Sequence, residues 1–280
     1  MTTATVPAGS ARTRRAGRSG TLTGPSALGL GAAVLWFSLL VLIPLALVVT
    51  TALAGGPAGF LDAVTSPQTL AAVELTVVQA LLVTLLNVVM GTVIAWVLVR
   101  DRFWGRRVLD VVIDIPFALP TIVAGLVLLS LYGPQSPIGV DVANTRASVF
   151  LALAFVTLPF VVRTVQPVLE ELEAEVEEAS ASLGAGRLTT FRRVVLPSLV
   201  PSVAAGAALS FARGISEYGS LVLLSGNLPN RTEVVSVRVL TYIENGNQAS
   251  AAAAATLMLV VALAVIVALD VIQRRVARRG

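Results

Sequence analysis

The sequence predicts an all-α integral membrane protein with six transmembrane helices and both termini in the cytoplasm. Three observations predict this fold class: the composition, six long apolar segments and the distribution of arginine. Of the 280 residues, 56% are hydrophobic and 13% are charged, whereas a soluble domain has about 25% charged residues. Because the chain has so few charged side chains to cover a soluble surface, we expect most of it to lie in lipid.

Six apolar segments are long enough to cross a bilayer, whose core of about 30 Å requires roughly 20 residues of helix. The expected spans are residues 28–54, 70–99, 109–132, 147–166, 198–224 and 249–272. An Arg-rich stretch precedes the first span, as in a signal peptide, but the apolar run exceeds the roughly 7–15 residues of a signal peptide. We therefore expect an uncleaved anchor at residues 28–54, preceded by a disordered cytoplasmic tail at residues 1–24, which is rich in Arg, Thr and Gly.

Arginine predicts the orientation of the spans. All 20 basic residues are Arg, and four lie in each of the N-terminal tail, residues 100–108, residues 163–197 and the C-terminal tail. The three connections on the other side contain only Arg146, Arg231 and Arg238. Because basic residues concentrate in cytoplasmic connections, this distribution places both termini in the cytoplasm of a multi-pass membrane protein.

Several residue types are missing from the chain. It has no Cys, His or Lys, which excludes a disulfide framework, a thiolate nucleophile, an imidazole base and the usual zinc ligands. A G-x-x-x-x-G-K-[ST] nucleotide-binding loop is also excluded, because it requires Lys. The net charge of +4 does not indicate a nucleic-acid partner, since the Arg residues lie at the ends of apolar runs. We therefore expect a chain that is not an enzyme and binds no cofactor.

The longest cytoplasmic connection, residues 163–197, has the pattern of two short helices. Apolar residues recur in it at spacings of three and four, which marks one face of a helix. These residues are Leu169, Leu172, Val176, Ala179 and Leu183. Gly184 is a suitable helix end, a second helix follows, and Pro197 suits the first turn of the fifth span. The sequence therefore predicts a helix pair at about residues 169–195. A solvated acidic linker between two spans would show the same pattern of residues.

A longer pattern in this connection favours a docking role. Glu178-Ala179-Ser180, then Gly184, then nine residues and Val194-Val195-Leu196-Pro197 resembles the E-A-A-x-x-x-G-x9-I-x-L-P signature of ATP-binding-cassette importer permeases, with Ser180 in place of the second Ala. The resemblance implies that the helix pair docks on a separate cytoplasmic ATPase, which carries the ATP and Mg²⁺. The residues expected at this contact are Glu178, Ala179, Ser180, Leu183, Gly184, Ala185, Phe191, Leu196 and Pro197. Glu178 would pair with a basic side chain, and Leu183 and Phe191 would fill a pocket on the ATPase.

Three further stretches, residues 114–121, 158–171 and 210–219, resemble the T subunits of bacterial sulfate/thiosulfate permeases. The similarity extends over about residues 30–275, with residues 69–273 as the type-1 transmembrane domain. It implies a subunit of the bacterial cytoplasmic membrane that imports sulfate and thiosulfate. The implied partners are a homologous W-type permease subunit in a heterodimer, two copies of the ATPase and an extracytoplasmic sulfate-binding protein.

The third span contains two prolines and two carboxylates whose roles remain open. Pro116 and Pro120 bend the helix, and such a bend either is structural only or lets the two halves move separately as a gate requires. Asp110 and Asp114 follow Arg107 at three and seven residues, which is typical of an ion-pair ladder along one helix.

Arg213 and Glu217 lie within the expected fifth span, where charges are costly and normally face each other or a water-filled cavity. One interpretation is a mutual salt bridge, because the two residues are four apart. The other is an anion pathway, since the donors of Arg match the oxygens of sulfate and a nearby Glu would keep binding weak enough for release. In the second span, Glu74, Gln79 and Asn87 are expected to hydrogen-bond between helices.

Two alternative functions stay open. A molybdate or tungstate permease would carry an anion of the same shape and charge as sulfate. A stand-alone channel or secondary anion transporter would place charges in several spans and would leave the docking pattern unexplained.

Overall fold

The computed structural model describes residues 24–172, 178–180 and 182–277, and every regular element among them is helical. The elements are α1 (Gly24–Phe37), η1 (Ser38–Leu42), α2 (Ile43–Ala52), α3 (Gly56–Thr65), α4 (Pro67–Arg100), α5 (Arg106–Ile113), α6 (Ile115–Ala118), α7 (Thr121–Tyr132), α8 (Arg146–Glu171), α10 (Arg187–Thr190), η2 (Phe191–Val195), α11 (Leu196–Ile215), α12 (Gly219–Leu224), α13 (Val235–Glu244) and α14 (Gln248–Ala277). The expected tail at residues 1–24 lies, apart from Gly24, outside the described residues. Residues 1–47 form one unit and residues 48–280 another, and the bundle described below belongs to the second.

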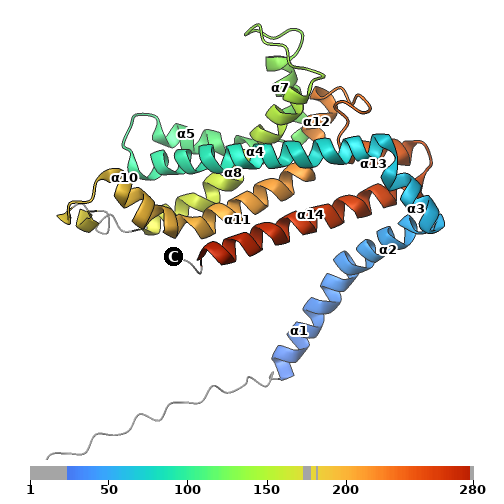
Figure 1. Cartoon of the computed structure of the whole chain (residues 1–280), viewed down its shortest axis with the longest axis horizontal. Helices are drawn as coiled ribbons and strands as arrows, with labels where there is room; N and C mark the ends of the chain where they lie inside the picture. Colours follow the sequence, from blue (N-terminus) through green and yellow to red (C-terminus); the bar gives the residue numbers. More distant parts are fainter. Residues whose placement is uncertain (1–23, 173–177, 181, 278–280) are drawn as a thin grey trace, which may run out of the picture. The chain divides into compact units, whose positions relative to one another are not determined.

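Five helical stretches are long and apolar enough to cross a membrane, and a bent helix pair provides a sixth span if it counts as one. The straight stretches are Ser26–Ala52, Pro67–Arg100, Arg146–Glu171, Leu188–Ile215 and Gln248–Val271. They agree with five of the six expected spans. Helices α4, α8, α11 and α14 lie side by side and form the bundle (Figure 1).

The third span differs from the expectation of one continuous helix. The chain breaks at Leu119 and Pro120, whose ψ angles of 136° and 135° are extended. Residues Arg106–Ala118 and Thr121–Tyr132 are bent by 115° relative to each other, and α7 projects away from the long helices (Figure 1). Pro120 makes the break, because the residue before a proline is pushed out of helical geometry, whereas Pro116 lies in the first turn of α6.

The fifth span also differs, because it begins and ends earlier than expected. Instead of a separate short helix before the span, α10, η2 and α11 run on without a break, and the helix then ends at Ile215. Residues 219–224 form the separate helix α12. The π-helical turn η2, in which the Leu196 amide donates to the Phe191 carbonyl, lets the chain continue through Pro197. Proline has no N–H to donate, so a wider turn before it relieves the interrupted hydrogen-bond pattern.

A π-helical turn before a proline also occurs in the first span. The π-helical turn η1 ends at Leu42, and the Ile43 amide donates to the Ser38 carbonyl. Pro44 follows at the same offset as Pro197 follows η2. In both places a proline follows a π-helical turn by two residues and does not end the helix.

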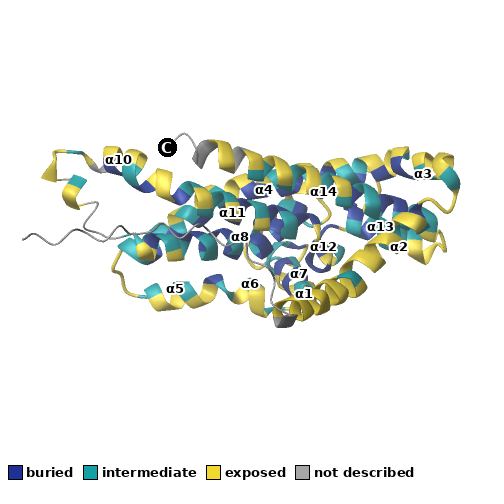
Figure 2. Cartoon of the chain, turned by 90° about the horizontal axis from the view of Figure 1, so that it is seen from below, coloured by how far each residue is buried: buried dark blue, intermediate teal, exposed yellow. Residues whose placement is uncertain are grey.

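One cluster of buried residues lies between α4, α8 and α11 (Figure 2). Gly91 on α4 allows close approach, since a Cβ there would lie 2.8 Å from the Val161 side chain of α8. Asn87 donates to the Thr157 hydroxyl at 2.8 Å, which confirms its expected interhelical bond. The expectation is wrong for Glu74, which lies exposed, and Gln79 is buried with no partner for its side-chain oxygen.

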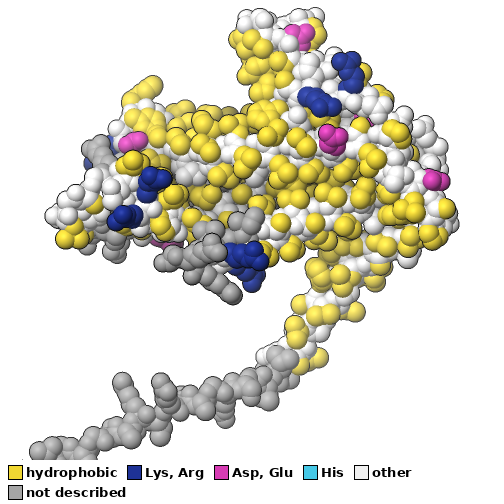
Figure 3. All heavy atoms as spheres, in the orientation of Figure 1, with side chains coloured by type: hydrophobic (Ala, Val, Ile, Leu, Met, Phe, Trp, Pro, Cys, Tyr) yellow, Lys and Arg dark blue, Asp and Glu magenta, His cyan; other side chains and the backbone are white. Residues whose placement is uncertain are grey.

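The outer faces of the long helices are apolar. Figure 3 shows that hydrophobic side chains cover the middle of the bundle on one face, while charged side chains lie mainly toward its ends and at the loops. A surface of this kind is unsuited to water and suits lipid or another apolar helix.

Hydrogen bonds define the two ends of the bundle. At one, Arg238 of α13 donates to Gln68 at the start of α4, and Arg146 at the start of α8 donates to the Arg231 carbonyl. We call this the α13 end. At the other, Arg100 at the end of α4 donates to the Leu172 carbonyl after α8. We call this the α10 end, because α10 and α5 lie there (Figure 1).

Candidate functional site

The candidate docking segment begins later than the sequence predicted. Helix α8 runs to Glu171, and Leu172 after it is extended. Leu169, expected as the first apolar residue of a docking helix, is instead completely buried in the last turn of α8, in the core between the long helices. Residues 173–177, including the expected Val176, lie outside the described residues, so the described docking segment comprises residues 178–180 and 182–197.

A tight turn at Gly184 presents Leu183. Gly184 has φ of +85°, a conformation that a glycine adopts without steric cost. Ala185 N donates to the Ser180 carbonyl at 3.1 Å, and the Leu183 side chain is left 90% exposed. An apolar side chain this exposed on an otherwise polar turn is suited to a complementary pocket on a partner.

Ser180 contributes a contact that an Ala could not make. Its hydroxyl lies 2.9 Å from that of Thr190 on α10, within hydrogen-bond distance. This bond connects the helical residues before the turn to the helix after it. Ser180, which replaces the second Ala of the family signature, therefore connects the two sides of the turn.

Phe191, which the sequence predicted to fill a pocket on the ATPase, makes contacts within its own chain. Its ring meets that of Trp96 on α4 edge to face, with ring centroids 5.5 Å apart, and it packs against the core between the long helices. It anchors the docking segment to α4. Leu196 and Pro197 are exposed in the first turn of α11, and Glu178, Ala179 and Gly184 are exposed as well.

Arg163 joins the third span to the fourth. From α8, its guanidinium donates to both carboxylate oxygens of Asp114 at 2.8 and 2.7 Å, to the Asp110 carboxylate at 2.7 Å and to the Asp110 carbonyl at 2.7 Å. It also donates to the Gln166 side chain at 2.7 Å. Asp110 and Asp114 thus pair across two helices and not with Arg107 along one. Sequence spacing did not reveal this, because the partners are 49 and 53 residues apart.

An aromatic contact strengthens the same connection. Phe117 of α6 meets Phe160 of α8 edge to face, with centroids 4.9 Å apart. The half of the third span before the break is therefore joined to α8, the helix that leads into the docking segment.

The other half of the third span is joined elsewhere. Helix α7 packs on α12 so closely that a Cβ on Gly125 would lie 2.7 Å from the Ser220 carbonyl oxygen. Both halves of the third span contact α8, and the half after the break at Leu119 and Pro120 also packs on α12.

Arg213 and Glu217 form the expected salt bridge, with Arg213 Nη2 2.6 Å from Glu217 Oε2. The Glu217 side chain is 1% exposed and that of Arg213 is 28% exposed. Glu217 Oε1 also accepts from the amide and the hydroxyl of Ser220, each at 2.9 Å. The pair therefore connects the last turn of α11, where a cation is favoured, to the first turn of α12, where a carboxylate is favoured.

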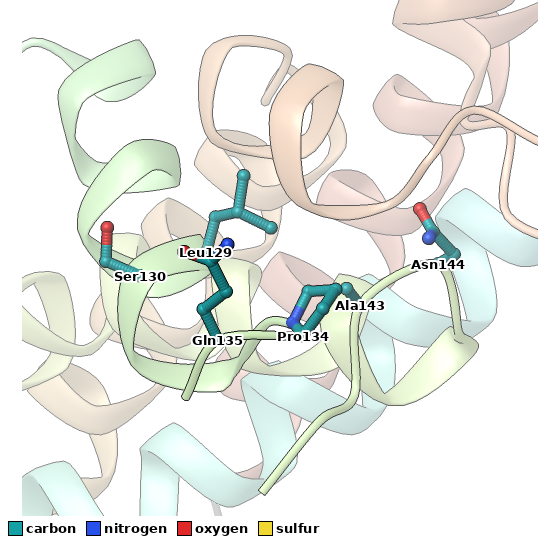
Figure 4. A pocket seen from close by; sticks show the side chains of 6 residues that line it. All are labelled: Leu129, Ser130, Pro134, Gln135, Ala143 and Asn144. Carbon is teal, nitrogen blue, oxygen red and sulfur yellow. The ribbon is translucent and has the colours of Figure 1, made fainter. Parts of the chain in front are cut away.

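Two neighbouring cavities open among the loops of the α13 end. The larger, of about 410 Å³, is lined by six residues: Leu129, Ser130, Pro134, Gln135, Ala143 and Asn144 (Figure 4). The smaller, of about 240 Å³, shares Asn144 and is lined also by Thr145, Arg146, Arg231 and Thr232. The sequence did not predict these cavities, because no local pattern relates residues 144–146 to residues 231–232.

Comparison with known proteins identifies the family. Residues 87–279 match the binding-protein-dependent transport system inner membrane components. The sulfate transport system permease protein CysT of Salmonella typhimurium strain LT2 is 41% identical over 259 residues, which cover 90% of this chain and 94% of that protein. The probable sulfate transport system permease protein of Nephroselmis olivacea is 45% identical over 221 residues, 76% of this chain and 78% of that protein.

Solved structures agree on the fold. A chain of a bacterial ABC transporter involved in the import of the acidic polysaccharide alginate is 17% identical and superposes with a TM-score of 0.74, covering 89% of this chain and 94% of that chain. A chain of the MetNI methionine ABC transporter, solved in inward-facing conformations, has a TM-score of 0.56, with 18% identity and coverage of 74% of this chain and 94% of that chain. With the helical bundle, the broken third span and the match over residues 87–279, this chain belongs to the family of inner membrane components of binding-protein-dependent transport systems.

Proposed function

We propose that this chain is the permease subunit of an ATP-driven importer that moves sulfate, and thiosulfate with it, into the cytoplasm. The observation that carries the proposal is the 41% identity to a sulfate permease over nearly the whole length of both chains. The chain is a multi-pass inner-membrane subunit and not itself an enzyme. These relatives do not favour the alternatives, a molybdate or tungstate permease and a stand-alone channel or secondary transporter.

The proposed assembly is a heterodimer with a homologous W-type permease, two copies of an ATPase and an extracytoplasmic sulfate-binding protein. The distribution of Arg supports a cytoplasmic position for both termini and for the α10 end. The exposed turn at Leu183 and Gly184 supports docking of residues 178–185 on the ATPase. Phe191 would support this contact indirectly, by fixing the docking segment to α4.

The transport path remains a proposal with two elements. Arg213 would offer a weak anion site, because Glu217 compensates its charge while part of its side chain stays exposed. The break at Pro120, with Pro116 at the start of α6, would act as a hinge between the halves of the third span.

Uptake of radiolabelled sulfate tests the function. The chain would be expressed with its partner subunits in a bacterial strain that lacks its own sulfate permease. We expect ATP-dependent uptake that excess unlabelled sulfate or thiosulfate abolishes and that equimolar molybdate leaves nearly unchanged. Absence of uptake, or stronger competition by molybdate than by sulfate, would show that the proposed cargo is wrong.

The same assay tests the role of Arg213. We expect Arg213→Ala to lower sulfate uptake and sulfate-stimulated ATP hydrolysis about tenfold, the usual result of losing one charge-assisted anion contact. Glu217→Gln is the matched variant, since it keeps the shape of the side chain and the Ser220 contacts while it removes the opposing charge. Wild-type transport by Arg213→Ala would leave the pair with a structural role alone.

A further inference from the structure

Two Arg side chains line the smaller cavity at the α13 end. Arg146 begins α8, and Arg231 lies in the loop between α12 and α13. Both are exposed, and together with Asn144, Thr145 and Thr232 they surround about 240 Å³. Every side chain in this lining is either cationic or an uncharged hydrogen-bonding group.

Neither of these two Arg has an acidic partner in the described part of the chain. No carboxylate oxygen there lies within 4.0 Å of Arg146 or Arg231, in contrast to Arg163, Arg213, Arg238 and Arg274. The two Arg are also held together, because Arg146 Nε donates to the Arg231 carbonyl at 3.3 Å. Like charges around one recess repel each other, so the arrangement favours an anion within it.

Hydrogen bonds fix the walls of the cavity independently of any ligand. The Asn144 amide donates to the Leu224 carbonyl at 3.0 Å, which joins the loop before α8 to the end of α12. The buried Thr232 hydroxyl donates to the Ser225 carbonyl at 2.6 Å and accepts from the Leu228 amide at 3.0 Å. Both Arg are therefore presented from a preorganised frame, which lowers the entropic cost of binding.

We propose that this cavity is an extracytoplasmic receiving site for a tetrahedral oxyanion dianion such as sulfate. Two guanidinium groups match an ion with two charges and four oxygens, since each guanidinium can bind two oxygens. A recess lined by two cations and hydroxyl groups suits a small ion better than a flat acidic protein surface. The cargo and the side of the membrane rest on the proposed function, whereas the anion site rests on the cavity itself.

Chemical labelling tests the site without any variant. The complete transporter in lipid nanodiscs would be treated with phenylglyoxal, which modifies accessible Arg, and the modified residues would be located by mass spectrometry. We expect sulfate to slow modification of Arg146 and Arg231 about tenfold relative to chloride at equal ionic strength, as for a charge-assisted contact. Arg102 and Arg107, which are exposed at the α10 end outside the docking segment, are the controls and should react equally in both salts.

Variants test whether the site serves transport. We expect Arg146→Gln and Arg231→Gln to lower uptake at subsaturating sulfate about tenfold and Arg231→Lys to lower it less, because Lys keeps the charge but not the forked geometry. Arg107→Gln is the matched control and should transport normally.

Three results would overturn the proposal. The first is equal labelling of Arg146 and Arg231 in sulfate and chloride, and the second is wild-type uptake by both Gln variants. The third is protection of the two Arg from phenylglyoxal by the sulfate-free binding protein but not by sulfate. The last would identify a docking contact for protein carboxylates. If the wild type itself fails to transport sulfate, the proposed function fails, while the labelling result still decides whether the anion site exists.

Discussion

Glu233 and Arg238 form an ion pair at the α13 end that is almost closed off from solvent. Their side chains are 3% and 12% exposed, and the nearest charged atoms are 3.9 Å apart. Arg238 has other partners, because it donates to Gln68 at 2.7 Å and lies 4.3 Å from the centre of the Tyr242 ring. Arg238 is thus well stabilised, whereas Glu233 accepts one long bond of 3.4 Å from Thr241.

This environment makes the charge of Glu233 unfavourable. Burial raises the pKa of Glu233, and the positive charge of Arg238 and the bond from Thr241 offset only part of the effect. A carboxyl group whose pKa is higher in the folded state stabilises that state at pH values below its unfolded pKa. This stabilisation is lost as the pH rises through the folded pKa.

We therefore expect Glu233→Gln to stabilise the transporter at high pH. The apparent melting temperature of the purified complex should exceed that of the wild type at pH 8 and approach it as the pH falls to 4. Glu244→Gln is the control, since Glu244 is exposed at the end of the adjacent helix α13, and it should melt like the wild type. A variant that melts below the wild type at pH 8 would show that the bond to Arg238 dominates.

The third span shows how an element can be divided between two neighbours. Arg163 and Phe160 hold its first half on α8, while Gly125 brings its second half against α12. Because α8 leads into the docking segment, movement of that segment would reach α5 and α6 through Arg163.

We expect Arg163→Gln to weaken the coupling of ATP hydrolysis to transport. Arg163 is 29% exposed and its two partners 44% and 49%, so solvent screens the pairs and the loss of stability should be about 1 kcal/mol. The effect on coupling should be larger, and sulfate uptake per ATP hydrolysed should fall about tenfold. This is the result expected if Arg163 makes one charge-assisted contact in only one of the two transport states. Both rates would be measured on the same reconstituted transporter.

A matched ion pair serves as the control for this prediction. Arg274 and Asp270 lie 2.8 Å apart on the single helix α14, so Arg274→Gln removes a comparable exposed pair without separating two helices. Wild-type coupling in both variants would mean that Arg163 contributes stability alone. Partial coupling in Arg163→Lys would support the need for its forked geometry.

The sequence predicts the membrane spans better than it predicts the breaks in the helices and the contacts between them. Long apolar runs have few alternatives to a membrane span, so four straight spans were predicted within a few residues, whereas the fifth span is shifted. Pro120 predicted a bend, but its angle of 115° depends on the packing of α7 against α12. Pro197 was expected to begin a new helix, because a proline alone does not distinguish a helix start from a π-helical turn. Arg163 and the Arg146–Arg231 cavity join residues that are distant in sequence, so no local pattern reveals them.

At the scale of the whole molecule, the α10 end and the α13 end have different surfaces. The α10 end carries the turn with the exposed Leu183 and the packed Phe191. The α13 end carries the two loop cavities. The proposed function places the ATPase at the first end and the binding protein at the second.

The absence of Cys from the whole chain makes this arrangement directly testable, because a single introduced Cys is the one thiol that the permease carries. In right-side-out vesicles, a membrane-impermeant thiol reagent should label Ile243→Cys, which is exposed on α13, and should not label Leu183→Cys.

In detergent, where both ends are accessible, Leu183→Cys should react rapidly in the permease pair without ATPase. Bound ATPase should slow this reaction about tenfold or more, because a side chain held in a partner pocket reacts only after the contact opens. Trp104→Cys is the control at the same end: Trp104 is 99% exposed outside the docking segment and should react equally with and without ATPase. Labelling of Leu183→Cys from outside would contradict the orientation, and an unchanged rate with the ATPase bound would contradict docking at this turn.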